Sequence, residues 1–205
     1  WSTTIATWPP RQGSGRVERR RPFHDIADVP PLLEFVPNFS EGKNRALVDG
    51  LVAAMTAVAG VKCLGSELDG NHNRAVVTLA GPANAIAEAA VRGAKAAKER
   101  IDLRSHKGEH KRMGAMDVCP FVPLAGATMA DAIATAKQVG ARIGKELELP
   151  VFLYAEAATR ESRRVLGSFR NKEFEGLMPL VGTDPEFTPD FGPAKLHATA
   201  GAVAV

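Results

Sequence analysis

Two periodicities of apolar residues alternate along residues 32–169 and predict the secondary structure. Short apolar runs bounded by proline, glycine or asparagine favour strands, and apolar residues spaced three or four apart favour helices. The strands are expected at residues 32–36, 61–64, 74–80, 118–124 and 151–154. The helices are expected at residues 47–58, 82–100, 128–147 and 160–169.

The order of these elements predicts the fold class. Strand-helix-strand-strand-helix-strand matches the split βαβ pattern of ferredoxin-like sandwiches. A further helix, strand and helix follow it. We therefore expect an α/β (α+β) fold, a βαββαβ ferredoxin-like sandwich with an extra C-terminal helix and strand. Pro120 and Pro123 indicate that its fourth strand is interrupted or lies at an edge.

Composition changes at both ends of this region and suggests three segments. Residues 1–31 begin with Trp rather than Met and are rich in Pro, Arg, Ser and Thr. They predict a disordered N-terminal extension, with an organellar transit peptide as the alternative. Residues 32–180 form the expected domain. Residues 181–205 hold clustered Gly, Pro and Asp, which predicts a linker and then the start of another element.

Charge and cysteine content narrow the function classes. The net charge of the 205-residue chain is only +3, and five arginines of the extension lie between positions 11 and 21. Global charge therefore gives no case for nucleic-acid binding. No apolar run approaches the roughly 18–20 residues that cross a bilayer. Cys63 and Cys119 stand apart, which predicts buried free thiols in a soluble protein of a reducing compartment, the cytoplasm by default.

Residues 104–114 carry the strongest candidate chemistry. This stretch, Arg-Ser-His-Lys-Gly-Glu-His-Lys-Arg-Met-Gly, holds His106 and His110 among several cations. Imidazole suits proton transfer near neutrality, and neighbouring cations favour its neutral form. Two alternatives stay open, an ordinary surface loop and a metal site. The pair Lys107-Gly108 argues against the helix that would place both rings on one metal ion.

Two other segments place polar side chains next to expected strands. Residues 67–74 combine the carboxylates of Glu67 and Asp69 with Arg74, whose planar guanidinium can grip a substrate carboxylate. Residues 36–42 form a polar turn at a strand end and include Asn38. Taken singly, residues 67–74 also fit an ordinary hairpin turn, and residues 36–42 also fit an ordinary helix entry.

Together these segments resemble glutamate formiminotransferase, whose N-terminal subdomain also occurs in formimidoyltransferase-cyclodeaminase. The carrying motifs are Val36-Pro-Asn-Phe-Ser-Glu-Gly42, His72-Asn-Arg74, His106-Lys-Gly-Glu-His110 and Arg112-Met-Gly-Ala-Met-Asp-Val-Cys-Pro-Phe121. Shorter matches follow at residues 150–154, 156–157, 162–164 and 189–193. The resemblance covers roughly residues 32–205 in order.

This resemblance implies a folate-dependent transferase of histidine degradation and one-carbon metabolism. It implies two similar α/β subdomains with tetrahydrofolate between them, a homodimer, and no metal. The catalytic histidine of the family corresponds to His110 and its acidic partner to Glu67 or Asp69. The stretch that contacts folate corresponds to residues 192–201. The expected substrate and folate contacts are Asn38, Arg74, His106, Arg112, Gly192, Pro193, Lys195 and Gly201.

The expected reaction moves a formimino group from N-formimino-L-glutamate to N5 of tetrahydrofolate. His110 would remove the N5 proton and later protonate the leaving nitrogen, which typically contributes about 10² to 10⁴-fold. Lys107 and Lys111 would favour the anionic tail of folate. A second subdomain is expected beyond Val205; a non-catalytic folate-binding module or an inactive fragment lacking it are the alternatives. A formyl donor and a metal-dependent hydrolase also stay open.

Overall fold

A computed structural model describes residues 30–205, so the prediction for the N-terminal extension lies almost entirely outside the described residues. Its strands are β1 (Leu32–Phe35), β2 (Asn38–Phe39), β3 (Lys62–Asp69), β4 (Arg74–Pro82), β5 (Met116–Val118), β6 (Phe121–Pro123), β7 (Val151–Phe152) and β8 (Val203–Ala204). Its α-helices are α1 (Arg45–Thr56), α2 (Ala83–Arg100), α3 (Met129–Glu146), α4 (Gly167–Arg170) and α5 (Glu173–Leu177).

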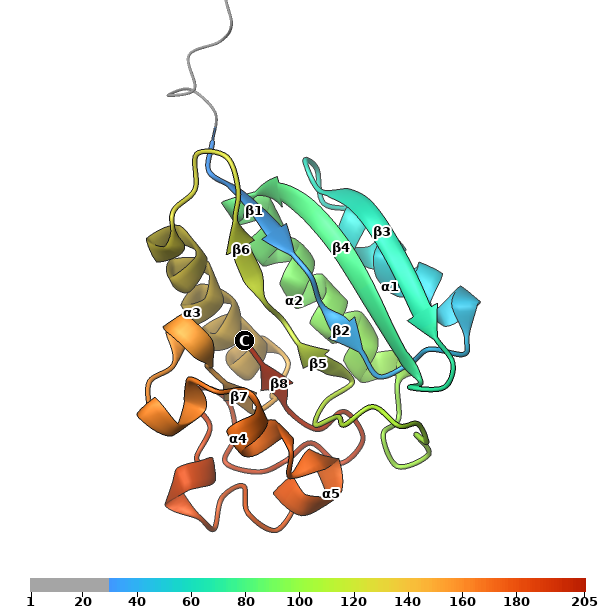
Figure 1. Ribbon diagram of the computed structural model, residues 1–205, viewed down its shortest axis with the longest axis vertical. Helices are drawn as coiled ribbons and strands as arrows, with labels where there is room; N and C mark the ends of the chain where they lie inside the picture. Colours follow the sequence, from blue (N-terminus) through green and yellow to red (C-terminus); the bar gives the residue numbers. More distant parts are fainter. Residues whose placement is uncertain (1–29) are drawn as a thin grey trace, which may run out of the picture.

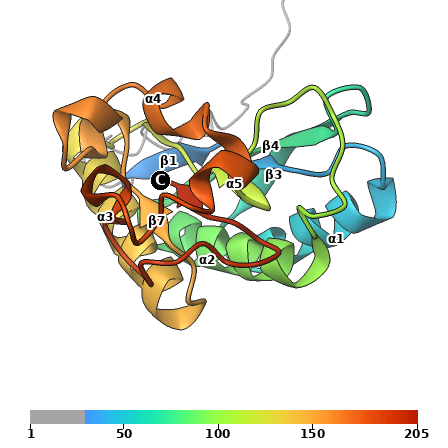
Figure 2. The same cartoon turned by 90° about the horizontal axis from the view of Figure 1, so that it is seen from below.

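The strands form one sheet, and α1, α2 and α3 pack side by side on it (Figure 1). Figure 2 shows α1 and α2 below this sheet and the short α4 above it. None of the helices within residues 30–205 is long and apolar enough to cross a membrane.

The central part of the sheet has the predicted split βαβ topology. β1 and β2 are two parts of one strand that breaks around Pro37, and both pair antiparallel with β4. On their other side, β6 pairs with β1 and β5 pairs with β2, while β3 pairs with the outer edge of β4. The fourth strand is interrupted at Pro120, between β5 and β6, as its prolines predict.

Alternation along the strands builds a core on the helix-covered face. In β1 and β4 every second residue is fully buried, which gives the predicted period of two. Small residues of α2 let it lie close to its neighbours: a Cβ on Gly93 would come within 2.7 Å of the Met55 sulfur. Each large aliphatic side chain buried here stabilises the fold by roughly 1.5–3 kcal/mol. Thr128 and Asp131 form the predicted capping box at the start of α3.

Residues 181–205, predicted as a linker and then the start of another element, end in a strand that belongs to this sheet. β8 lies between β5 and β7 and runs parallel to both. Val203, Ala204 and Val205 are almost fully buried. Turn-forming residues around position 190 resemble a linker locally, but a short strand of small apolar residues follows and fills the gap in the sheet. The boundary towards a further subdomain stays a prediction.

Two smaller expectations differ from the structure. The helix expected at residues 160–169 is divided into a 3-10 turn (Glu161–Arg163) and α4, because the Arg163 side chain is buried and donates to Asp190 and to the Thr188 carbonyl oxygen. Tertiary pairing there outweighs helix propensity. Both cysteines are free, but only Cys119 is buried, since Cys63 lies on the exposed edge strand β3.

Candidate functional site

Asn73 joins the three segments that the sequence singles out. At the tip of the β3–β4 hairpin, its Oδ1 accepts from the backbone N–H of Gly42 at 2.9 Å, and its Nδ2 donates to the Lys107 carbonyl oxygen at 3.1 Å. The Asn73 carbonyl oxygen lies 2.8 Å from Nε2 of His106. With φ at 52°, Asn73 adopts the left-handed conformation that asparagine tolerates better than most residues. Residues far apart in sequence therefore meet at one side chain.

The histidine loop, defined here as residues 106–114, packs directly on this hairpin tip. The backbone N–H groups of Glu109 and His110 donate to the carbonyl oxygens of Asn71 and His72, at 3.2 and 3.4 Å. A Cβ on Gly108 would overlap the His72 carbonyl oxygen, so only glycine allows this approach. The hairpin thereby fixes the loop that carries His110.

His110 belongs to a buried cluster with Asp117 and Arg170. Its Nε2 lies 2.7 Å from Nη2 of Arg170 and 3.5 Å from Oδ2 of Asp117. The Nε of Arg170 donates to the same carboxylate oxygen at 2.7 Å. The other oxygen of Asp117 accepts from the backbone N–H groups of Met113 and Gly114. Asp117 is fully buried, and the His110 side chain is only 9% exposed.

A β-bulge places Asp117 in this cluster. Asn38 of β2 is paired with Val118 and Phe39 with Met116, so Asp117 has no partner across the ladder. A bulge bends the strand and re-aims the extra side chain, and bulges are common beside active sites. Here the extra side chain is the carboxylate that contacts the imidazole.

His106 has a different environment from His110. Because a carbonyl oxygen only accepts, its Nε2 donates to Asn73, and its Nδ1 therefore accepts from Nε of Arg112 at 3.1 Å. Burial, with the nearby charge of Arg112, lowers the pKa of His106. Arg112 also forms a fork with Glu175, at 2.8 and 2.7 Å, and contacts Glu173. Arg112 thus ties the loop to α5, and its contact with substrate stays a prediction.

The hairpin segment lines a surface hollow of about 410 Å³. Glu67, Asp69 and Arg74 all face it, and Nε of Arg74 is buried with no hydrogen-bond partner among the described residues. Hydrogen bonds from His72 hold the pKa of Asp69 below its ordinary value. The carboxylate found beside His110 is Asp117, where Glu67 or Asp69 was predicted.

The remaining predicted contacts are divided between two places. Gly201, with φ at 68°, pairs with Gly114 at the end of the histidine loop. Gly192 instead packs against Gly144 of α3 and the carbonyl oxygen of Leu149. Pro193 and Lys195, which follow Gly192, are exposed. Asn38 donates to the Val36 carbonyl oxygen.

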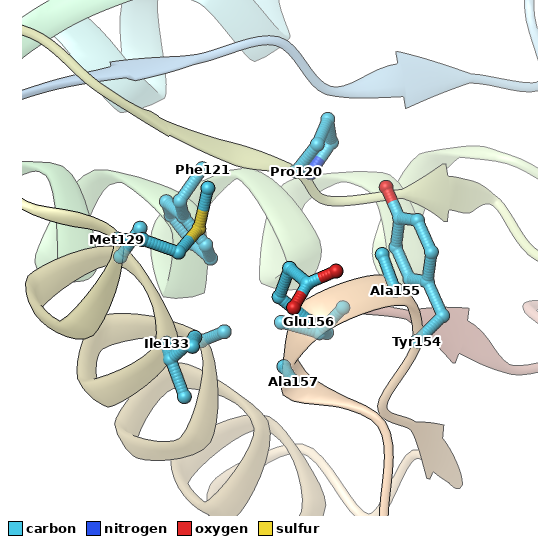
Figure 3. A pocket seen from close by; sticks show the side chains of 11 residues that line it. Pro120, Phe121, Met129, Ile133, Tyr154, Ala155, Glu156 and Ala157 are labelled. Atoms are coloured by element: carbon cyan, nitrogen blue, oxygen red, sulfur yellow. The ribbon is translucent and has the colours of Figure 1, made fainter. Parts of the chain in front are cut away.

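A second hollow, of about 170 Å³, lies between α3, β6 and the 3-10 turn Ala155–Ala157 (Figure 3). Met129 and Ile133 line it from α3, and the ring of Tyr154 closes the opposite side. Burial above all raises the pKa of Tyr154 to about 12. Apolar side chains dominate this hollow, so it suits an apolar group better than proton transfer.

Asp117 and Arg170 are the two residues of the cluster that the sequence patterns missed. A carboxylate inside the apolar strand Met-Asp-Val was the available signal for Asp117, since buried charges need partners. Arg170 lies 60 positions from His110 in a four-residue helix, and its sequence surroundings carry no comparable signal. Among residues 30–205, no group of three or more His, Cys, Asp or Glu is placed to hold a metal ion.

Comparison with known proteins identifies the family. Residues 32–205 match the formiminotransferase domain, N-terminal subdomain. The chain belongs to this family. The resemblance inferred from the motifs is therefore confirmed, and the hairpin, histidine loop and C-terminal strand described above all lie within the matched formiminotransferase subdomain.

Named relatives share this subdomain. Glutamate formimidoyltransferase of Streptococcus pyogenes serotype M1 is 47% identical over 174 residues, which cover 85% of this chain and 58% of that protein. The enzyme of the same name from Thermoplasma acidophilum is 46% identical over 174 residues, 84% of this chain and 57% of that protein. Formimidoyltransferase-cyclodeaminase of Rattus norvegicus is 42% identical over 171 residues, 83% and 31% respectively. The formiminotransferase subdomain thus spans little more than half of the shorter relatives.

Proposed function

We propose that this chain takes part in transferring a formimino group from N-formimino-L-glutamate to tetrahydrofolate, with His110 as the acid–base group. The cluster of His110, Asp117 and Arg170 is the observation that carries this proposal. Relatives named for formimidoyl transfer support the same reaction type.

The cluster has the charges that such a reaction needs. N5 of tetrahydrofolate attacks the formimino carbon, becomes cationic in the tetrahedral adduct, and must lose its proton. When His110 takes that proton it becomes an imidazolium, which the buried carboxylate of Asp117 stabilises. His110 then returns the proton to the departing nitrogen of glutamate, so the enzyme regains its starting protonation.

The hollow beside the hairpin matches the donor substrate. N-formimino-L-glutamate carries two carboxylates and a basic amidine, which is cationic near neutrality. The positively charged side chain of Arg74 lines the hollow and can bind a carboxylate, and the carboxylates of Glu67 and Asp69 favour the amidinium. The hairpin tip contacts the loop through the backbone N–H of His110, and we propose that a donor held in the hollow reaches the acid–base group from this side.

Several family properties enter the proposal only as predictions. They are contact of tetrahydrofolate with residues 192–201 and with Asn38, assembly as a homodimer, and a cytoplasmic location. A formyl donor is the competing substrate, and a folate-binding module without turnover is the competing function.

The decisive experiment compares the chain with four variants, two for the rate of formimino transfer, followed spectroscopically, and two for binding of the donor. His110→Ala should lose about 10²-fold or more of the rate, while Gln138→Ala, at an exposed position of α3, should retain it. Arg74→Met should weaken binding of the donor, which calorimetry measures, whereas Arg92→Met on the exposed face of α2 should not. Equal rates for His110→Ala and Gln138→Ala would exclude the proposed base. Folate binding without any turnover would identify the non-catalytic module.

A further inference from the structure

His110 presents one ring nitrogen to two groups that make opposite demands. Arg170 only donates hydrogen bonds, so a neutral imidazole meets it with the lone pair of Nε2 and carries its proton on Nδ1. Asp117 is a carboxylate that only accepts, so its bond with His110 requires the proton on Nε2. The neutral ring can satisfy one of these partners at a time.

The distances in the free chain favour Arg170. Nη2 of Arg170 lies at hydrogen-bond distance, 2.7 Å from Nε2, whereas the Asp117 oxygen is 3.5 Å away. The resting imidazole is therefore the Nδ1–H form. Nδ1 forms no hydrogen bond within residues 30–205. It is also not fully buried, so solvent can reach it.

We propose that Arg170 is a positioning residue that holds resting His110 in the Nδ1–H form, and that Nε2 must pass from Arg170 to Asp117 before the exposed Nδ1 can accept a proton. The exchange balances: one proton leaves Nδ1 for water, another is taken up at Nε2, and the ring stays neutral. Its catalytic meaning rests on the proposed function, but the position of the proton does not.

The surroundings make this exchange a small movement. Arg170 also donates through Nε to Asp117, so only its Nη2 contact must be given up and the buried charge pair persists. The charged or titratable groups around the ring are Asp117 of β5, Arg170 of α4 and His106 of the same loop, and Tyr154 after β7 lies close to Asp117 and Arg170. Asp117 is the group among them that can accept from Nε2 at short range.

His106 supplies an internal comparison. Its hydrogen bonds, Nε2 to the Asn73 carbonyl oxygen and Nδ1 from Arg112, require the Nε2–H form. Two histidines four positions apart should therefore carry their protons on different ring nitrogens. Nothing in the chemistry of imidazole predicts that difference, which comes from their partners alone.

The test is nitrogen-15 NMR of the histidine rings in the intact chain without substrates. At about pH 9, above the ordinary titration range of histidine, ring shifts and couplings distinguish the two tautomers. We expect Nδ1–H for His110 and Nε2–H for His106. Arg170→Met should convert His110 to Nε2–H and leave His106 unchanged. Arg170→Lys, which keeps a donor near Nε2, should retain at least part of the Nδ1–H form.

Each outcome tests the tautomer of His110 independently of any turnover. Nε2–H on His110 in the unsubstituted chain would overturn the inference, as would Nδ1–H that persists in Arg170→Met. If that variant does not fold, a scalar coupling across the Arg170–His110 hydrogen bond in the unsubstituted chain tests the same contact, and its absence overturns the proposal. The expected tautomers together with no formimino transfer would refute the proposed function and leave this inference standing.

Discussion

Replacing Asn73 by alanine should destabilise the subdomain far more than the same change at an exposed asparagine usually does. The change removes the acceptor of the buried Gly42 N–H, which costs about 1–3 kcal/mol, and the bond to the Lys107 carbonyl oxygen, about 0.5–1.5 kcal/mol. It also forces alanine into the left-handed conformation, at roughly 1 kcal/mol. Together these contributions come to about 4 kcal/mol.

Urea and thermal unfolding measure this loss directly. For a domain of this size, about 4 kcal/mol lowers the melting temperature by roughly 8–16 °C. Asn71→Ala is the matched control, because its exposed side chain forms no hydrogen bond within the described residues, and it should change stability by less than about 0.5 kcal/mol. Asn73→Gly loses the same two hydrogen bonds but tolerates the left-handed backbone, so it should regain only the roughly 1 kcal/mol of stability assigned to that conformation.

The comparison of these variants can refute the reasoning. If Asn73→Ala and Asn71→Ala unfold at the same urea concentration, Asn73 does not join the three segments. If Asn73→Gly is as unstable as Asn73→Ala, the left-handed backbone contributes nothing. The predicted order is Asn71→Ala most stable, Asn73→Gly intermediate and Asn73→Ala least.

Further predictions concern the loop and the sheet. Burial holds the pKa of His106 below its ordinary 6.5, so the unfolded chain binds the proton first and stability falls as pH drops below about 6.5. His106→Gln keeps a donor and an acceptor without titrating, so its unfolding free energy should decline less between about pH 7 and 5; His197, whose pKa burial also lowers, leaves a residual slope. Gly114→Ala would overlap the Ala202 carbonyl oxygen and should cost about 1–3 kcal/mol in urea unfolding, whereas Gly65→Ala, which meets nothing within 4 Å, should be tolerated.

Two results would contradict these expectations. Parallel stability curves for His106→Gln and the unsubstituted chain would mean that His106 is not held neutral by its surroundings. Equal unfolding midpoints for the two glycine variants would mean that the approach of the C-terminal strand to the histidine loop is looser than described.

The sequence predicts what depends on local pattern. The strands and helices of the split βαβ unit follow from periodicity, and the three motif segments already indicated where they would matter. Asp117 was missed as the partner of His110 because strict alternation along a strand does not reveal a bulge. Arg170 was missed because its contact is entirely non-local. The sequence indicates a new element at the end of residues 181–205 but not its place in this sheet, because a two-residue strand owes its stability to its neighbours.

The place of β8 has a consequence for the order in which the molecule is completed. β5 and β7 flank a gap that residues 203 and 204 fill. At a synthesis rate of about 5–20 residues per second, the facing edges of β5 and β7 keep unpaired backbone groups for several seconds before residues 203 and 204 are made. Such edges can pair with other chains, and late closure of distant segments slows folding. Since β5 also carries Asp117, the histidine cluster acquires its final surroundings only after residues 203 and 204 have been added.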